Sequence, residues 1–213
     1  MKITVVGTGY QGLVTGTCLA ENGHRIVCMD RDAERIRRLS QGEMPFHEPG
    51  LEELVVRNME EERLQFTTDL KQAVEDSLMI FLCVGTPVKE DGEADVSRVL
   101  DATRQIAEAM SGYRIVVNKA TCPPGTSDTM ATLLRELSGH PADVVVNPDF
   151  MKEGSAIDDF MRPDRIIVGC EEVRVREIMK ELYGPFLRTG KPILMMSARS
   201  AEMTKYATNV MLA

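Results

Sequence analysis

The chain has 213 residues, of which 43% are apolar and 27% are charged, a composition typical of a soluble globular protein with one large domain or two small ones. Its net charge of −8, without a basic stripe interleaved with aromatic residues, argues against nucleic acid as a partner. No apolar run approaches the roughly twenty residues that span a bilayer, and no charged-then-apolar leader precedes the first strand, so we expect a cytoplasmic protein that does not bind membranes.

The first predicted elements are a strand and a helix joined by a glycine-rich turn. A short β-branched strand runs directly into Gly7, Gly9 and Gly12, which have G-x-G-x-x-G spacing, and residues 13–22 have a helical pattern. Gly7 permits the tight turn, Gly9 lets the backbone approach a pyrophosphate, and Gly12 allows the helix to pack close to the sheet. The free N–H groups of the helix would then face the phosphates, so this turn predicts a dinucleotide site.

An acidic residue follows at the distance that this fingerprint requires. A second strand, Arg25–Met29, ends on Asp30, about twenty residues beyond the glycines. A carboxylate there accepts hydrogen bonds from both hydroxyls of an adenosine ribose and repels a 2′-phosphate, which favours NAD over NADP. Arg31 is the one residue that argues against this preference for NAD, because a basic side chain directly after the acid could accommodate a 2′-phosphate. The sequence leaves open whether Arg31 permits NADP.

Strands and helices alternate along the rest of the chain. Further strands are expected at 64–67, 79–84, 114–118, 144–146, 166–168 and 193–196. Helices are expected at 32–41, from Leu51, at 96–110, at 127–137 and from about Ser200, and Asp69 has the position of an N-cap. Buried strands alternating with amphipathic helices indicate a parallel sheet covered on both faces, a doubly wound α/β domain of the Rossmann type. We assign residues 1–198 to this domain. We expect 199–213 to begin a connecting helix that is cut at Ala213.

Polar segments follow several of these strands. In open α/β sheets the ligand lies beyond the carboxyl ends of the strands, where the segments 85–87, 119–126 and 147–154 are found. Each segment alone is accounted for by a turn, an N-cap or a strand terminator. Together at one edge they predict a site. Lys205 and Asn209, four residues apart, share a face of the last helix, on which Glu202 also lies. An ammonium beside an amide suits a developing oxyanion or a sugar hydroxyl.

The cysteines indicate neither a metal site nor disulfides. They are odd in number and scattered, form no C-x-x-C pair and have no histidine at ligand spacing. They are Cys18, Cys28, Cys83, Cys122 and Cys170. We therefore expect no metal.

With these segments in place, the chain resembles the UDP-glucose/GDP-mannose dehydrogenases over essentially its whole length. These are four-electron NAD enzymes that oxidise a nucleotide-sugar alcohol to a uronic acid in polysaccharide biosynthesis. The resemblance rests on eight ordered motifs, at residues 7–12, 48–51, 84–87, 91–95, 119–126, 147–154, 162–165 and 200–206. The last two most resemble the branch that converts UDP-glucose to UDP-glucuronate. Oxidation of GDP-mannose or of UDP-N-acetylmannosamine is the alternative, and the sequence does not fix the sugar.

The resemblance implies roles for individual residues. Those implied to contact NAD are Gly7, Gly9, Tyr10, Gln11, Gly12, Asp30, Arg35, Thr86, Thr121 and Glu153. Those implied to contact the UDP-sugar are Asp149, Phe150, Met151, Lys152, Glu153, Lys205 and Asn209. The implied catalytic residues are Thr121, which orients a water, Asp149, a general base, Lys205, which stabilises an oxyanion, and Asn209. In the family, a cysteine captures the aldehyde, and water hydrolyses the thioester formed after the second oxidation.

The chain departs from the family pattern at several positions. Position 11 is glutamine where valine is usual, and position 35 is arginine where lysine is usual. Position 149 is aspartate where glutamate is usual, which shortens the arm by one methylene. Displacing a catalytic base by about an ångström can cost on the order of a hundredfold in rate, so the general-base role of Asp149 stays open.

The family's nucleophilic cysteine belongs to a segment that these 213 residues do not include, and we interpret Cys122 as a packing residue. We therefore expect the NAD-binding part of the enzyme, without the UDP-binding domain, to be inactive alone and a homodimer when full length. A non-catalytic NAD-binding module is one alternative. A two-electron β-hydroxyacid dehydrogenase is another, which the segments 48–51 and 147–150 disfavour.

Overall fold

The computed structural model describes residues 1–187 and 192–212, which fold around one eight-stranded sheet. The strands are β1 (Lys2–Val6), β2 (Arg25–Met29), β3 (Leu64–Thr67), β4 (Met79–Leu82), β5 (Arg114–Asn118), β6 (Ala142–Val146), β7 (Ile166–Gly169) and β8 (Ile193–Met196). The helices are α1 (Tyr10–Glu21), α2 (Ala33–Ser40), α3 (Leu51–Glu60), α4 (Leu70–Asp76), α5 (Ser97–Ala109), α6 (Thr126–Leu137), α7 (Ala156–Met161), α8 (Val173–Tyr183) and α9 (Ala198–Leu212), with a 3₁₀ turn η1 (Gly184–Phe186).

The strand order, β3-β2-β1-β4-β5-β6-β7-β8, confirms the doubly wound sheet. The chain moves outward from β1 to β3 on one side and then restarts at β4 on the other side of β1, so the order reverses between β1 and β4. Ligands of such sheets bind at this switch point. The sheet is parallel with one exception, since β6 and β7 meet in antiparallel orientation through Val146 and Gly169, at the carboxyl ends of both strands.

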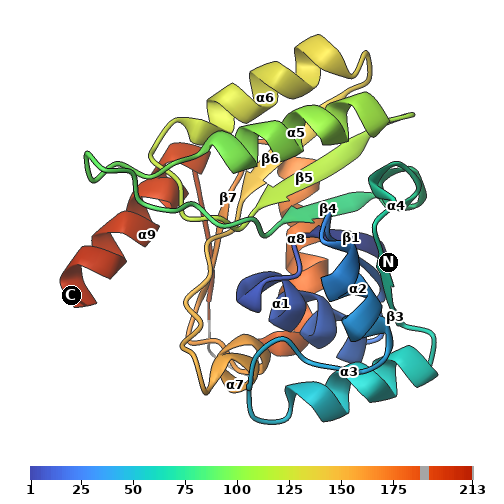
Figure 1. Cartoon of the computed structure of the whole chain (residues 1–213). Coiled ribbons are helices and arrows are strands. Elements are labelled where there is room, and N and C mark those ends of the chain that lie inside the picture. The colour runs from blue at the N-terminus through green and yellow to red at the C-terminus, as the bar shows by residue number, and fades with distance from the viewer. Residues whose placement is uncertain (188–191, 213) are drawn as a thin grey trace.

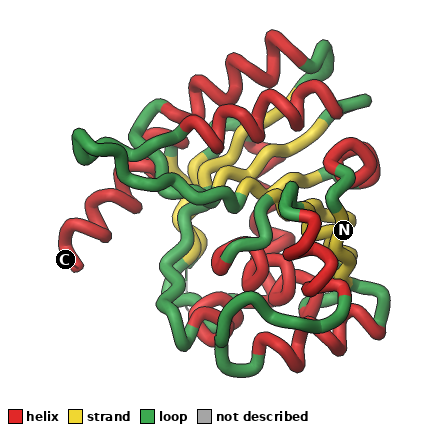
Figure 2. The backbone as a smooth tube through the Cα atoms, viewed as in Figure 1, coloured by secondary structure: helices red, strands yellow, loops and turns green. Residues whose placement is uncertain are grey.

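Helices cover both faces of the sheet (Figures 1 and 2). Side chains alternate between the two cores with the period of two that a strand imposes: Met79 and Phe81 of β4 pack on the core of α1, α3, α7 and α8, whereas Ile80 and Leu82 pack on that of α5 and α6. All four β4 side chains are fully buried. The continuous apolar run of β4 is thereby explained, because a central parallel strand is covered on both faces.

Several element boundaries differ from those expected. Helix α1 begins at Tyr10, three residues earlier than expected. The sequence did not predict this first turn because Gly12, a poor helix former, weakens the helical pattern there. Strand β4 ends at Leu82, and α9 begins at Ala198. Helices α7 and α8 were not expected. Ala213, the expected limit of the last helix, lies outside the described residues.

Helix α9 extends away from the body at the C-terminal end of the chain (Figure 1), and its last apolar residues, Val210, Met211 and Leu212, are 75–85% exposed. Within residues 1–187 and 192–212, no helix combines the length and apolar character needed to cross a membrane.

Candidate active site

The glycine-rich turn between β1 and α1 lies at the switch point of the sheet. Gly7 has a φ of +98°, and a Cβ there would lie 2.6 Å from the carbonyl oxygen of Cys83. A Cβ on Gly12 would lie 1.8 Å from the carbonyl oxygen of Gly7. Only glycine therefore fits at these two positions. By contrast, a Cβ on Gly9 would meet nothing within 4 Å. Gly9 thus faces open space into which a phosphate can approach the backbone.

A cleft of about 360 Å³ opens beside this turn, and we call it the glycine-turn cleft. It is lined by Val6, Gly7, Gly9, Met29, Asp30, Arg31, Arg35, Leu70, Cys83, Val84, Gly85, Arg98, Asp101, Ala102 and Gln105. Four of the residues predicted to bind the cofactor therefore line this cleft, namely Gly7, Gly9, Asp30 and Arg35. The side chains of two others are engaged elsewhere: Tyr10 donates to Glu48, and Gln11 donates to Asp149.

Four hydrogen bonds hold the Asp30 carboxylate, which lines the glycine-turn cleft. Its Oδ2 accepts hydrogen bonds from the Thr8 amide (2.8 Å) and hydroxyl (2.9 Å) and from the Arg35 guanidinium (3.1 Å). Its Oδ1 accepts one bond, from the Asp32 amide at 3.1 Å. Burial by itself raises the pKa of Asp30, but these donors together hold it below its ordinary value. The carboxylate is therefore charged at neutral pH, and Oδ1 has capacity left for a ribose hydroxyl.

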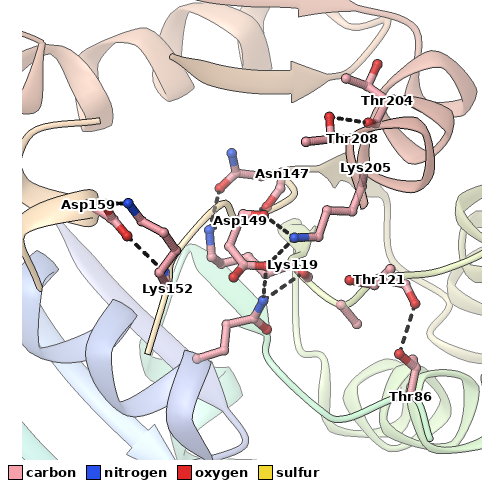
Figure 3. A network of polar contacts seen from close by, with 12 residues as sticks. Thr86, Lys119, Thr121, Asn147, Asp149, Lys152, Asp159, Thr204, Lys205 and Thr208 are labelled. Carbon is pink, nitrogen blue, oxygen red and sulfur yellow. Dashed lines mark hydrogen bonds and ion pairs between the residues drawn. The ribbon is translucent and has the colours of Figure 1, made fainter. Parts of the chain in front are cut away.

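Thr86 and Thr121, which follow neighbouring strands, contact each other. The Thr86 hydroxyl donates to the carbonyl oxygen of Thr121 at 2.9 Å and joins the loops after β4 and β5 (Figure 3). The structure thus brings these two predicted residues together. Glu153, in contrast, is exposed and lines neither the glycine-turn cleft nor the cleft described next.

A second cleft of about 470 Å³, the Lys205 cleft, lies between α9, the segment after β6 and the segment before β7. Its lining consists of Lys119, Asn147, Pro148, Asp149, Phe150, Met151, Lys152, Asp159, Phe160, Arg162, Pro163, Asp164, Arg165, Ile166, Tyr183, Lys205, Thr208, Asn209 and Leu212. It includes all the predicted sugar-binding residues except Glu153.

The centre of the Lys205 cleft is a lysine beside a carboxylate (Figure 3). Lys205 Nζ donates to the carbonyl oxygen of Asp149 at 2.6 Å and lies 3.8 Å from Asp149 Oδ1. It also lies 5.1 Å from the ring centroid of Phe150, a cation–π contact. The two side chains are only 13% and 15% exposed. An ammonium has three donors, so at least one remains for an oxygen atom of a ligand.

The Asp149 carboxylate has a further partner that was not expected. Gln11 Nε2, on the first turn of α1, donates to Asp149 Oδ1 at 2.5 Å and to the carbonyl oxygen of Lys119 at 3.1 Å. Glu202 does not join Lys205. It is buried, and its carboxylate accepts the backbone N–H groups of Gly125 (2.6 Å) and Ser127 (2.8 Å), which caps α6. Burial raises the pKa of Glu202, although these amides oppose the rise.

The sequence did not identify three residues that line the Lys205 cleft and hydrogen-bond one another, Lys119, Asn147 and Tyr183. Lys119 is buried, and its Nζ donates to Asn147 Oδ1 at 3.2 Å, an atom that also accepts from the Tyr183 hydroxyl at 2.5 Å. Burial lowers the pKa of Lys119, and the nearby Asp149 opposes that shift. Lys119 could have been identified from the sequence, because it directly follows β5 at the edge of the sheet where ligands bind. Tyr183 gave no such signal because it belongs to the unexpected helix α8.

Glu48 is a second missed residue, known from the sequence only as part of a motif. Its buried carboxylate accepts the backbone N–H groups of Gly154 and Ala156, both at 2.8 Å, and the Tyr10 hydroxyl. It therefore ties the segment after β6 to the first turn of α1. Cys122 is 2% exposed, and burial raises its pKa to about 11, so it is a thiol at neutral pH.

Comparison with known proteins gives a consistent result. The family model described as "UDP-glucose/GDP-mannose dehydrogenase family, NAD binding domain" matches residues 1–187. UDP-glucose 6-dehydrogenases from Pseudomonas aeruginosa and Rhizobium meliloti are 44% and 46% identical over 218 residues, which cover 100% of this chain and 48% and 50% of those proteins. The chain thus spans about half the length of the curated relatives it matches.

Solved structures agree with this result. A UDP-glucose dehydrogenase from Pyrobaculum islandicum superposes with a TM-score of 0.95 at 36% identity, over 99% of this chain and 49% of that one. A ternary complex of GDP-mannose dehydrogenase from Pseudomonas aeruginosa has a TM-score of 0.95 at 34% identity, over 100% and 50%.

Proposed function

Because this chain belongs to the UDP-glucose/GDP-mannose dehydrogenase family, we propose that it supplies the NAD site and part of the sugar site of an enzyme that oxidises UDP-glucose to UDP-glucuronate. The family match is to an NAD-binding domain, so NAD is the cofactor of this fold. The glycine-turn cleft fits it, since Gly9 leaves room for a pyrophosphate and Asp30 presents a free acceptor to a ribose hydroxyl.

The observation that carries the proposal is the pairing of Lys205 with Asp149 in a cleft of its own. Binding of a dinucleotide at the glycine turn needs neither residue, so the pair argues against a module that only binds NAD. When bound, NAD would supply the hydride acceptor for the carbon that is oxidised. Loss of the hydroxyl proton to a base leaves negative charge on the substrate oxygen, and the partly desolvated Lys205 ammonium would stabilise that charge.

Asp149 is proposed as the general base. Its Oδ1 is occupied by Gln11 and faces Lys205, whereas no described contact engages Oδ2. Oδ2 can therefore accept a proton from a hydroxyl or from a water held near Thr121. We propose that Asn209, at the rim of the Lys205 cleft, hydrogen-bonds the sugar.

The nucleophilic step is not assigned to these residues. All five cysteines lie among residues 1–187 and all are buried, so none presents a thiolate to the Lys205 cleft. We therefore propose that this 213-residue chain binds NAD without completing the four-electron reaction.

We propose UDP-glucose as the substrate because identity to the curated UDP-glucose 6-dehydrogenases reaches 44% and 46%. Among the solved structures the difference is small, since the UDP-glucose dehydrogenase is 36% identical and the GDP-mannose dehydrogenase 34%. UDP-N-acetylmannosamine is the third candidate, and the structure of such an enzyme from Staphylococcus aureus is 26% identical.

Two measurements test the proposal. Calorimetry on this chain should show binding of NAD in preference to NADP, with Asp30→Ala as the control. The protein as its complete gene encodes it should reduce two NAD per UDP-glucose, followed by NADH absorbance, and should be slower with GDP-mannose and UDP-N-acetylmannosamine. Binding of NAD without NADH formation from any nucleotide sugar would refute the enzymatic proposal. Preference for another sugar would correct the substrate.

A further inference from the structure

The Gln11 side chain connects the cofactor turn to the Lys205 cleft. It starts from the first turn of α1, two residues after Gly9, and its Nε2 reaches Asp149 Oδ1 at 2.5 Å and the Lys119 carbonyl oxygen at 3.1 Å. Both partners are acceptors, so the amide nitrogen and not the amide oxygen must face them. The hydrogen-bond pattern therefore fixes the rotamer of Gln11 and joins α1 to the segments that follow β5 and β6.

From this geometry we propose that Gln11 is a positioning residue that holds the Asp149 carboxylate in its working orientation. This inference rests on the proposed function, because it gives Asp149 the role of the base. An aspartate has two rotatable side-chain bonds, and the cleft around it is open. The hydrogen bond from Gln11 to Oδ1 fixes the rotation of the carboxylate and leaves Oδ2 without a described contact.

The structure places Gln11 and Asp149, which are 138 positions apart in the chain, in direct contact.

Lys205 cannot replace this anchor. Its Nζ lies 2.6 Å from the Asp149 carbonyl oxygen but 3.8 Å from Oδ1, so its close contact is with the backbone. The one described hydrogen bond to the Asp149 carboxylate comes from Gln11. Because Gln11 is fixed to the turn that faces the dinucleotide, the base is also placed relative to the cofactor.

The simpler reading is that Gln11 only ties α1 to β5 through the Lys119 carbonyl oxygen. That role predicts a loss of stability, with kcat and KM unchanged in whatever protein remains folded. A positioning role predicts a lower kcat, because a displacement of about an ångström at the reacting groups can cost on the order of a hundredfold in rate. The Kd for NAD should then stay within about twofold, since the backbone of the turn is unaltered.

The test uses variants of the protein as its complete gene encodes it. Gln11→Met keeps the reach of the side chain and removes the donor, and we expect kcat to fall by about 10- to 100-fold. Gln11→Glu places an acceptor against two acceptors and should lower kcat further. Gln65→Met, at an exposed position of the edge strand β3, removes an amide elsewhere as a matched control. Thermal unfolding of each variant separates a loss of fold from a loss of orientation.

Rescue provides the second readout. In the double variant Gln11→Val/Asp149→Glu, the longer carboxylate side chain no longer needs the hydrogen bond from the amide. Its kcat should therefore be at least about tenfold higher than the kcat expected from multiplying the effects of the two single variants. A folded Gln11→Met variant with wild-type kcat, or strictly multiplicative effects in the double variant, would overturn this inference and leave the proposed function standing. A wild-type protein that oxidises no nucleotide sugar would overturn the proposed function and this inference with it.

Discussion

Replacing Glu48 by glutamine should strongly destabilise the fold. The Glu48 carboxylate is 4% exposed, and each of its oxygens accepts a backbone N–H group, from Gly154 to Oε2 and from Ala156 to Oε1, both at 2.8 Å. Oε2 also accepts the Tyr10 hydroxyl. Glutamine has the same shape but only one oxygen, so one amide N–H of the segment after β6 would face an NH₂ group.

The size of the effect follows from the groups left without partners. A buried donor that loses its acceptor costs about 1–3 kcal/mol, and Glu48→Gln creates two such donors, a backbone N–H and one N–H of the new amide. We therefore expect a loss of about 2–6 kcal/mol from the free energy of unfolding. This is a large share of the roughly 5–15 kcal/mol of a typical domain.

Urea unfolding at neutral pH measures this loss directly, through the midpoint at constant slope. Glu60→Gln, an exposed residue at the end of α3, is the matched control and should change the free energy of unfolding by no more than about 0.5 kcal/mol. A loss below about 1 kcal/mol in Glu48→Gln would show that the carboxylate is not the tie that the geometry indicates.

The same residue predicts a pH dependence. Burial raises the pKa of Glu48, but the Tyr10 hydroxyl and the backbone N–H groups of Gly154, Ala156 and Ile157 bring it below its ordinary value. A carboxyl whose pKa is lower in the folded state contributes stability that is present above its unfolded pKa and is lost as pH falls through its folded pKa. Wild-type protein should therefore lose more stability than Glu48→Gln below about pH 4.3, the ordinary value for glutamate.

Three further predictions concern other parts of the molecule. Asp30→Ala removes a charged acceptor for the ribose and should weaken NAD binding by about 10- to 100-fold in calorimetry, and an unchanged Kd would place the ribose elsewhere. Gly12→Ala would bring a Cβ to 1.8 Å from the Gly7 carbonyl oxygen, so we expect at least about 3 kcal/mol of destabilisation and loss of NAD binding, which an unaltered unfolding midpoint would contradict. For Glu202, whose pKa is raised by burial, the sign reverses: the contribution of this carboxyl to stability is present below its unfolded pKa and is lost as pH rises through its folded pKa. Wild-type stability should thus decline relative to Glu202→Gln as pH rises above about 4.3, and parallel curves would rule this out.

Much of the cofactor site was predictable from the sequence because its determinants are local. Gly12 is required by a contact with Gly7 in the same turn, and Asp30 directly follows the next strand. The doubly wound sheet was predictable for the same reason, since buried strands such as β4 are continuous apolar runs. The resemblance to the dehydrogenase family, confirmed by the match over residues 1–187, supplied the cofactor and the candidate residues of the Lys205 cleft.

The partners of those candidates were decided only by the tertiary structure. Gln11 and Asp149 are separated by 138 positions, and Glu48 and Ala156 by 108, so no periodicity or spacing could pair them. Glu202 shares a helix face with Lys205 in sequence, yet it caps α6 while Lys205 turns to Asp149. A hydrogen bond forms where the packing of strands and helices brings two groups together, and that packing depends on the whole chain. The sequence by itself therefore determined which chemistry collects at the edge of the sheet, and the fold determined which groups hold one another there.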